Sequence, residues 1–177
     1  EQLPLLFKLL RTSLYSDKIG AIVREVTSNC WDAHKEAGIG RNVRIVYQEK
    51  NPIIGTQPAL SFRDYGIGIS PNRMQTIFCK YLSSTKRGDN EQIGGFGIGS
   101  KSPFSYSDSF HIVTIHEGIK YTYLAFIDET QLGAISKLAQ EESDEENVVS
   151  VKNILMLKIE INDDNKSMNG SLKDIMT

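Results

Sequence analysis

The chain has 177 residues, 40% of them hydrophobic and 24% charged, an ordinary globular composition that suits one domain with or without part of a connector. A formal net charge of −2 argues against a general binder of nucleic acid or anionic membrane, while a local basic patch stays open. No apolar run reaches the roughly 20 residues that span a bilayer. Two cysteines make no disulfide framework, which favours free thiols in a reducing, cytoplasmic compartment. Because residue 1 is Glu, we expect a piece of a longer protein.

The N-terminal part of the chain predicts two helices. Between Leu5 and Tyr15, leucines recur with the spacing of one helical face. Packing on the domain's own core is favoured over a membrane-surface or partner-binding role, because a membrane-surface helix usually contains more basic residues than this segment does. The second helix begins after a cap at Ser16 or Asp17 and ends at Ala37, followed by Gly38 as a C-terminal stop.

The rest of the chain alternates between strand patterns, one helix and polar loops. In chain order we expect strands at 42–48 and 59–63, a helix from Pro71 to about Tyr81, a mobile loop at 82–96, a short helix from about Gly99 to Phe104, a hairpin of 109–116 and 120–127, a weaker strand at 134–138, an acidic loop at 141–146 and β structure at 148–161. This order predicts an α/β fold, a two-layer sandwich with a mixed, mostly antiparallel sheet and helices on one face.

The second predicted helix carries a polar stripe. Glu25, Asn29 and Asp32 stand at i, i+4 and i+7 and share one face. An Asn oxygen suits magnesium, and a Glu one turn earlier could orient and deprotonate a water molecule. The alternative is a solvent-facing stripe without function.

A glycine turn follows the strand at 59–63. Asp64 ends the strand, and Gly66 and Gly68 let the backbone approach a flat ligand closely. Asp64 could then accept a hydrogen bond from the amino group of adenine. Taken alone, an Asp before glycines is also typical of an ordinary turn.

A glycine-dense loop precedes the short helix and favours phosphate binding. It lacks the Walker A spacing, and it is too apolar for a flexible linker. Residues Ser84, Thr85 and Lys86 could add hydroxyls and a cation, or form a solvated loop. The candidate phosphate-binding residues of the loop are Gly94, Gly95, Phe96, Gly97, Ile98 and Gly99. We add Lys101, which follows the loop, as a candidate contact with the γ-phosphate.

Together these residues resemble the N, G1 and G2 boxes of the ATPase superfamily of gyrase, Hsp90, histidine kinases and MutL. The resemblance covers about 18–127, and the residues from Ser100 to Phe110 are most similar to the N-terminal domain of the membrane-associated rapid-lysis A proteins of T-even-type bacteriophages. It implies an Hsp90-like (Bergerat) fold that binds ATP or ADP with Mg²⁺. Glu25 would be the catalytic base, Asn29 the magnesium ligand and Asp64 the adenine contact.

The resemblance also implies a domain plan: an N-terminal helix or strap at 1–16, the ATP-binding domain at 17–162 and a tail or connector at 163–177. Lid closure, homodimerisation of the full-length protein and peripheral membrane association through other regions are expected; nucleic-acid binding is not. The sequence departs from the superfamily in one respect. Members often have a Gly-Thr pair on a late strand, whose Thr helps to hold a water molecule bound to adenine, and this chain has no such pair at 133–161. Ser143 or Ser150 could replace that Thr. An ATP-binding regulatory module with little turnover and a histidine kinase catalytic domain are the alternatives.

Overall fold

The computed structural model describes residues 2–79, 99–143 and 155–160. Its elements, in chain order, are α1 (Gln2–Thr12), α2 (Lys18–Ala37), β1 (Arg44–Gln48), β2 (Ala59–Arg63), α3 (Pro71–Cys79), the 3₁₀ helix η1 (Gly99–Ser105), β3 (Ser109–His116), β4 (Ile119–Ile127), β5 (Gly133–Glu142) and β6 (Leu155–Glu160).

The described strands form one sheet in the order β1-β2-β6-β3-β4-β5, and each neighbouring pair is antiparallel. The predicted mixed sheet is therefore wrong for these strands. Strand β6 lies between β2 and β3, with Leu157 opposite both Phe62 and Ile112. Because β2 and β3 are both antiparallel to β6, they point the same way, so Asp64 and His116 lie at the same edge of the sheet.

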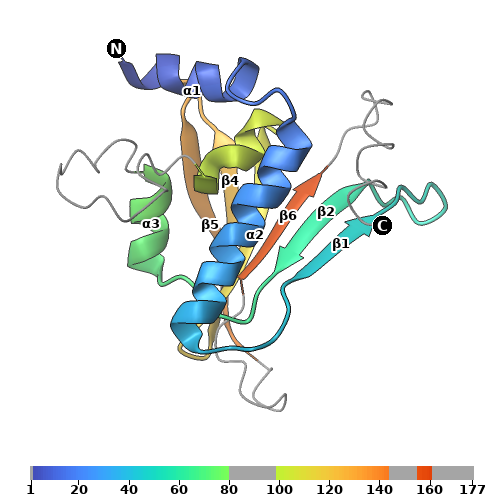
Figure 1. Cartoon of the computed structure of the whole chain (residues 1–177), viewed down its shortest axis with the longest axis vertical. Coiled ribbons are helices and arrows are strands. Elements are labelled where there is room, and N and C mark those ends of the chain that lie inside the picture. Colours follow the sequence, from blue (N-terminus) through green and yellow to red (C-terminus); the bar gives the residue numbers. More distant parts are fainter. Residues whose placement is uncertain (1, 80–98, 144–154, 161–177) are drawn as a thin grey trace.

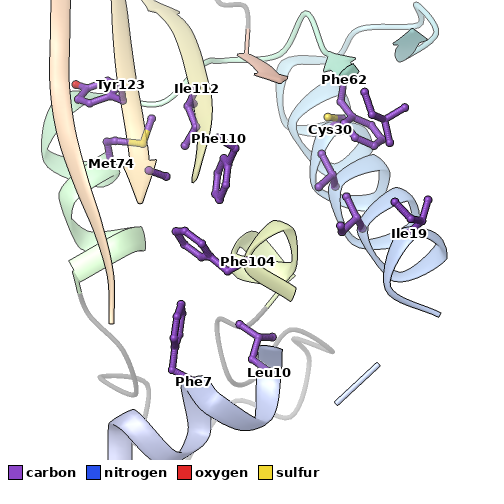
Figure 2. Close-up of a cluster of buried hydrophobic side chains, with 14 of the residues drawn as sticks. Phe7, Leu10, Ile19, Cys30, Phe62, Met74, Phe104, Phe110, Ile112 and Tyr123 are labelled. Atoms are coloured by element: carbon purple, nitrogen blue, oxygen red, sulfur yellow. The ribbon is translucent and has the colours of Figure 1, made fainter. Parts of the chain in front are cut away.

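Helices α1, α2 and α3 and the turn η1 lie on one face of the sheet (Figure 1). The core between these layers is continuous. Figure 2 shows Phe104 of η1 between Phe7 of α1 and Phe110 of β3, with ring centroids 5.4 and 4.8 Å away. The chain thus has an α/β architecture with helices on one side of an antiparallel sheet.

Helix α2 begins and ends where the sequence predicts. The Asp17 side chain accepts a hydrogen bond from the backbone N–H of Gly20 at 2.9 Å, which satisfies a donor of the first turn. Gly38 takes the left-handed conformation, with φ of 67°, and its N–H closes on the last turn. These two local signals fix the position of the polar stripe along the helix.

Two details differ from the sequence predictions. Helix α1 buries Phe7 and Leu10, whereas Leu5 and Leu9 of the predicted apolar face are exposed. The weak strand at 134–138 extends to ten residues, so Glu141 and Glu142 belong to β5 rather than to an acidic loop. Each difference arises from partners distant in sequence, which a local periodicity does not contain. None of the described helices is long and apolar enough to cross a bilayer.

Candidate functional site

One turn of α2 faces the start of η1. A Cβ atom on Gly99 would lie 2.8 Å from Oε2 of Glu25, so the carboxylate points at the backbone of that glycine. The Glu25 side chain is 34% exposed, and its other oxygen lies 3.6 Å from the Arg24 guanidinium. Burial, and then the charge of Glu25, raises the pKa of Tyr15, which places that phenol near the same carboxylate. Glu25 is thus accessible from solvent and adjacent to the end of the predicted phosphate loop.

The next turns of α2 contact the loop that follows β2. Asp64 is fully buried, and its Oδ1 accepts the N–H of Gly66 at 2.8 Å. Burial, the charge of Asp64 and a hydrogen bond to Asp64 raise the pKa of the Cys30 thiol to about 12. The thiol therefore stays protonated at neutral pH and donates to the carboxylate. A carboxylate has about four lone-pair positions, so Asp64 can accept several hydrogen bonds at once.

Strand β3 contacts the second half of this loop, at Ile67 and Ile69. The N–H of Ile69 donates to the hydroxyl of Thr114 at 2.8 Å, and Thr114 is fully buried. Farther along β3, Nδ1 of His116 lies 3.4 Å from the carbonyl oxygen of Ile67. The loop is therefore fixed between the helical layer and the sheet.

Glycine at position 66 is required by its distance from α2. A Cβ atom there would lie 2.7 Å from the backbone carbon and oxygen of Ala33, far closer than real contacts. Backbone atoms of a helix cannot move aside cheaply. This explains why the loop needs a residue without a side chain at Gly66.

We expect Gly66→Ala to lower the free energy of unfolding by about 1–3 kcal/mol, as overpacking does in close-packed interiors. The matched control is Gly40→Ala, whose Cβ would meet no described atom within 4 Å and which should change stability by less than about 0.5 kcal/mol. Urea unfolding of both variants tests this. Equal midpoints for the two variants would contradict the close packing of the loop on α2.

The remaining two residues of the polar stripe are exposed. Asn29 lies on the outer surface of α2, one turn after Glu25. Asp32 is 75% exposed and lies 3.8 Å from the ammonium of Lys35. An exposed amide oxygen beside a carboxylate fits a hydrated magnesium ion that takes most of its ligands from water and phosphate. Within the described residues, no group of three or more His, Cys, Asp or Glu side chains could hold a metal ion by itself.

Lys101 has a partner that the sequence did not suggest. Its Nζ donates to the carbonyl oxygen of Ile77, near the end of α3, at 2.9 Å. The side chain is 3% exposed, and burial lowers the pKa of Lys101 to about 8. A contact with a γ-phosphate would require the ammonium to leave this position, and it stays a prediction.

The depressed pKa of Lys101 makes stability depend on pH. Between about pH 8 and pH 10.5 the unfolded lysine holds its proton while the folded one has lost it, so stability rises with pH. Relative to Lys101→Met, we expect the wild type to gain up to about 3 kcal/mol over this interval. Urea unfolding at several pH values measures the free energy of unfolding of both proteins. Because both contain the same tyrosines, the contributions of tyrosine titration cancel in the difference between them. Parallel pH curves would contradict a neutral buried amine.

Several predicted site residues lie outside the described part of the chain. They are Ser84, Thr85, Lys86, Gly94, Gly95, Phe96, Gly97 and Ile98. The predicted loop at 82–96, the tail at 163–177 and Ser150 also lie there. Ser143 is described and donates its N–H to the Gly118 carbonyl at 2.9 Å, next to β5. Since β6, β3 and β4 separate β5 from β2, Ser143 does not stand beside Asp64 in the sheet.

A hollow of about 760 Å³ lies elsewhere, between α1 and η1. Two of its basic side chains have partners: Arg11 pairs with Asp108, and Lys18 donates to the carbonyl oxygen of Arg11 at 2.7 Å. No residue of the predicted site lines it.

Three residues that contact the loop were not predicted as part of the site: Cys30, His34 and Thr114. Cys30 and His34 lie one turn apart on the buried face of α2, where Cys30 reads as ordinary core. A histidine on such a face is a weak signal that a polar partner lies opposite. Thr114 lies on β3, and nothing in the local sequence relates it to residue 69.

Comparison of the chain with protein-family models and with curated proteins gave no match. The function is therefore inferred from these residues and their geometry.

Proposed function

We propose that this chain is a magnesium-dependent ATP-binding and ATP-hydrolysing domain with an Hsp90-like arrangement. The observation that carries the proposal is that α2 joins all three candidate motifs. Its Glu25 turn faces Gly99, and its next turns contact Asp64 and Gly66. Gly99, at the described end of the glycine loop, and the loop after β2 thus both lie against the helix that carries Glu25, as a nucleotide site made from them requires.

The adenine end of the proposed site is the loop after β2. Asp64 would accept a hydrogen bond from the exocyclic amino group of adenine, while Gly66 and Gly68 leave the backbone open to the base. Asp64 is fully buried, so neighbouring groups must move before a base reaches it. A buried acceptor discriminates strongly against a base that lacks the donor, because the acceptor is then left unpaired.

The phosphate end of the proposed site is the outer face of α2 near Gly99. Asn29 would hold Mg²⁺, which neutralises charge on the phosphates when bound. Glu25 would accept a proton from a water molecule as the water oxygen attacks the γ-phosphorus, with the β–γ bridging bond breaking and ADP leaving. Asp32 and Lys101 are further candidates for polar contacts with the nucleotide or its ion.

Nucleotide-driven closure of the segment at 82–96 and homodimerisation of the full-length protein belong to the same proposal. ATP binding can drive closure only if the closed state binds ATP more tightly than the open state. The relationship to phage rapid-lysis A proteins and a peripheral location at the membrane are further parts of the proposal.

The test is incubation of the chain with γ-labelled ATP and Mg²⁺, followed by separation of free phosphate from protein. Release of labelled phosphate supports an ATPase. Label retained on the protein would indicate a phosphotransferase of the histidine kinase type. Binding measured by calorimetry without either product would indicate a regulatory module, and absence of binding would contradict the proposal.

A further inference from the structure

His34 contacts the loop that contains Asp64. Its Nε2 accepts the backbone N–H of Tyr65 at 2.8 Å, and its side chain is only 1% exposed. Because Nε2 accepts a hydrogen bond, the ring is neutral and carries its proton on Nδ1. That Nδ1 has no hydrogen-bond partner in the described part of the chain. Among the described residues, the hydrogen bond from Tyr65 to Nε2 is therefore the one that this buried imidazole makes through its ring nitrogens.

This bond acts on the peptide that joins Asp64 to Tyr65. A peptide unit is planar, so fixing the direction of the Tyr65 N–H also fixes the carbonyl side of that unit, which belongs to Asp64. The neighbouring contacts come from the same stretch of α2: the Cys30 thiol donates to Asp64, and the Ala33 backbone abuts Gly66. Residues 64, 65 and 66 are therefore each anchored by a different residue of this stretch.

The Tyr65 side chain adds a second constraint at the same point. Its ring lies 3.6 Å from the Arg41 guanidinium carbon and 5.5 Å from that of Arg63, and the ring centroid is 6.1 Å from His34. The side chain is 8% exposed. These contacts restrict the side chain of Tyr65, while the hydrogen bond to His34 restricts its backbone.

We propose that His34 is a positioning residue that sets the selectivity of the site for adenine, an inference that depends on the proposed function. By orienting the Asp64–Tyr65 peptide, it aims the Asp64 carboxylate at the amino group of the base. His34 itself touches no nucleotide. Its loss should therefore weaken the preference for adenine more than it weakens binding of the rest of the nucleotide.

The experiment compares Kd values for ATP and ITP, each with Mg²⁺, in the wild type, His34→Leu and His34→Gln. ITP has an oxo group in place of the amino group, so at that position it offers Asp64 an acceptor where ATP offers a donor. Leu removes the acceptor, whereas Gln can bring a carbonyl oxygen close to the position of Nε2. We expect His34→Leu to lower the ATP-over-ITP preference by about tenfold, the lower end of the effects seen for outer-shell positioning partners, and His34→Gln to keep most of it.

Amide hydrogen exchange supplies a readout that needs no nucleotide. The Tyr65 amide should lose protection in His34→Leu and regain it in His34→Gln, while the amides of β2 and β3 stay protected in both. If His34→Leu leaves the ratio of the two Kd values unchanged, whether or not both affinities fall, the positioning role is overturned. A wild type that binds neither nucleotide would overturn the proposed ATP function and this inference with it. If the wild type prefers ATP, the proposed function stands, and the variants alone decide whether His34 positions Asp64.

Discussion

Replacing Asp64 with Asn is expected to remove the thermal stabilisation that ATP and Mg²⁺ give to the wild type. At a nucleotide concentration about a hundredfold above Kd, binding adds roughly 2.7 kcal/mol, or about 5–10 °C for a domain of this size. Asn keeps the shape of the side chain and an oxygen that can accept the Gly66 N–H, but it replaces one acceptor with an amino donor. Facing the amino group of adenine, that donor has nothing to bond.

The control for this prediction is Asp128→Asn. Oδ1 of Asp128 accepts the N–H of Thr130 two residues on, at 2.8 Å, as Oδ1 of Asp64 accepts the N–H of Gly66 two residues on. It belongs to the connection between β4 and β5 and is not one of the candidate site residues. Asp128→Asn should keep the full shift. A full shift in Asp64→Asn would contradict the adenine contact, and loss of the shift in both variants would indicate a general effect of the substitution.

Glu25→Gln should abolish most turnover while leaving ATP affinity within a few fold of the wild type. General-base catalysis by a positioned carboxylate is typically worth about 10²–10⁴-fold in rate. Gln has nearly the same size and cannot accept the proton of the attacking water. Steady-state phosphate release, measured together with calorimetric Kd, separates the two quantities.

Two further variants sharpen the Glu25 prediction. Glu36→Gln removes an exposed carboxylate from the same helix and should leave turnover unchanged. Gly99→Ala places a methyl group 2.8 Å from Oε2 of Glu25, and because that oxygen ends a flexible side chain it can be displaced. We expect it to lower turnover and to change stability little. Wild-type turnover in Glu25→Gln would exclude Glu25 as the base.

Local sequence signals predicted the elements that carry the site. The bounds of α2 follow from the Asp17 cap and Gly38, and the hairpin of β3 and β4 follows from two alternating runs around Glu117 and Gly118. Strand β2 ends at Arg63, as expected, which places Asp64 at the edge of the sheet. In each case the determining groups lie within a few residues of one another.

The contacts between elements could not be predicted in this way. The insertion of β6 between β2 and β3 depends on pairing over about a hundred residues, and periodicity says nothing of partner choice. The bond from Tyr65 to His34 and the bond from Lys101 of η1 to the Ile77 carbonyl of α3 likewise join residues far apart in the chain. Asp64, Gly66 and Glu25 could be named as candidates from sequence, but their common contact with α2 required the structure.

The most direct test of the central claim is amide hydrogen exchange of the chain with and without a non-hydrolysable ATP analogue and Mg²⁺. The claim is that nucleotide binds where α2 meets the loop at 64–68 and the start of η1. We expect added protection in peptides covering 25–34, 64–69 and 99–102. Protection confined to α1 and the hollow beside it, or no added protection at saturating analogue, would contradict the account.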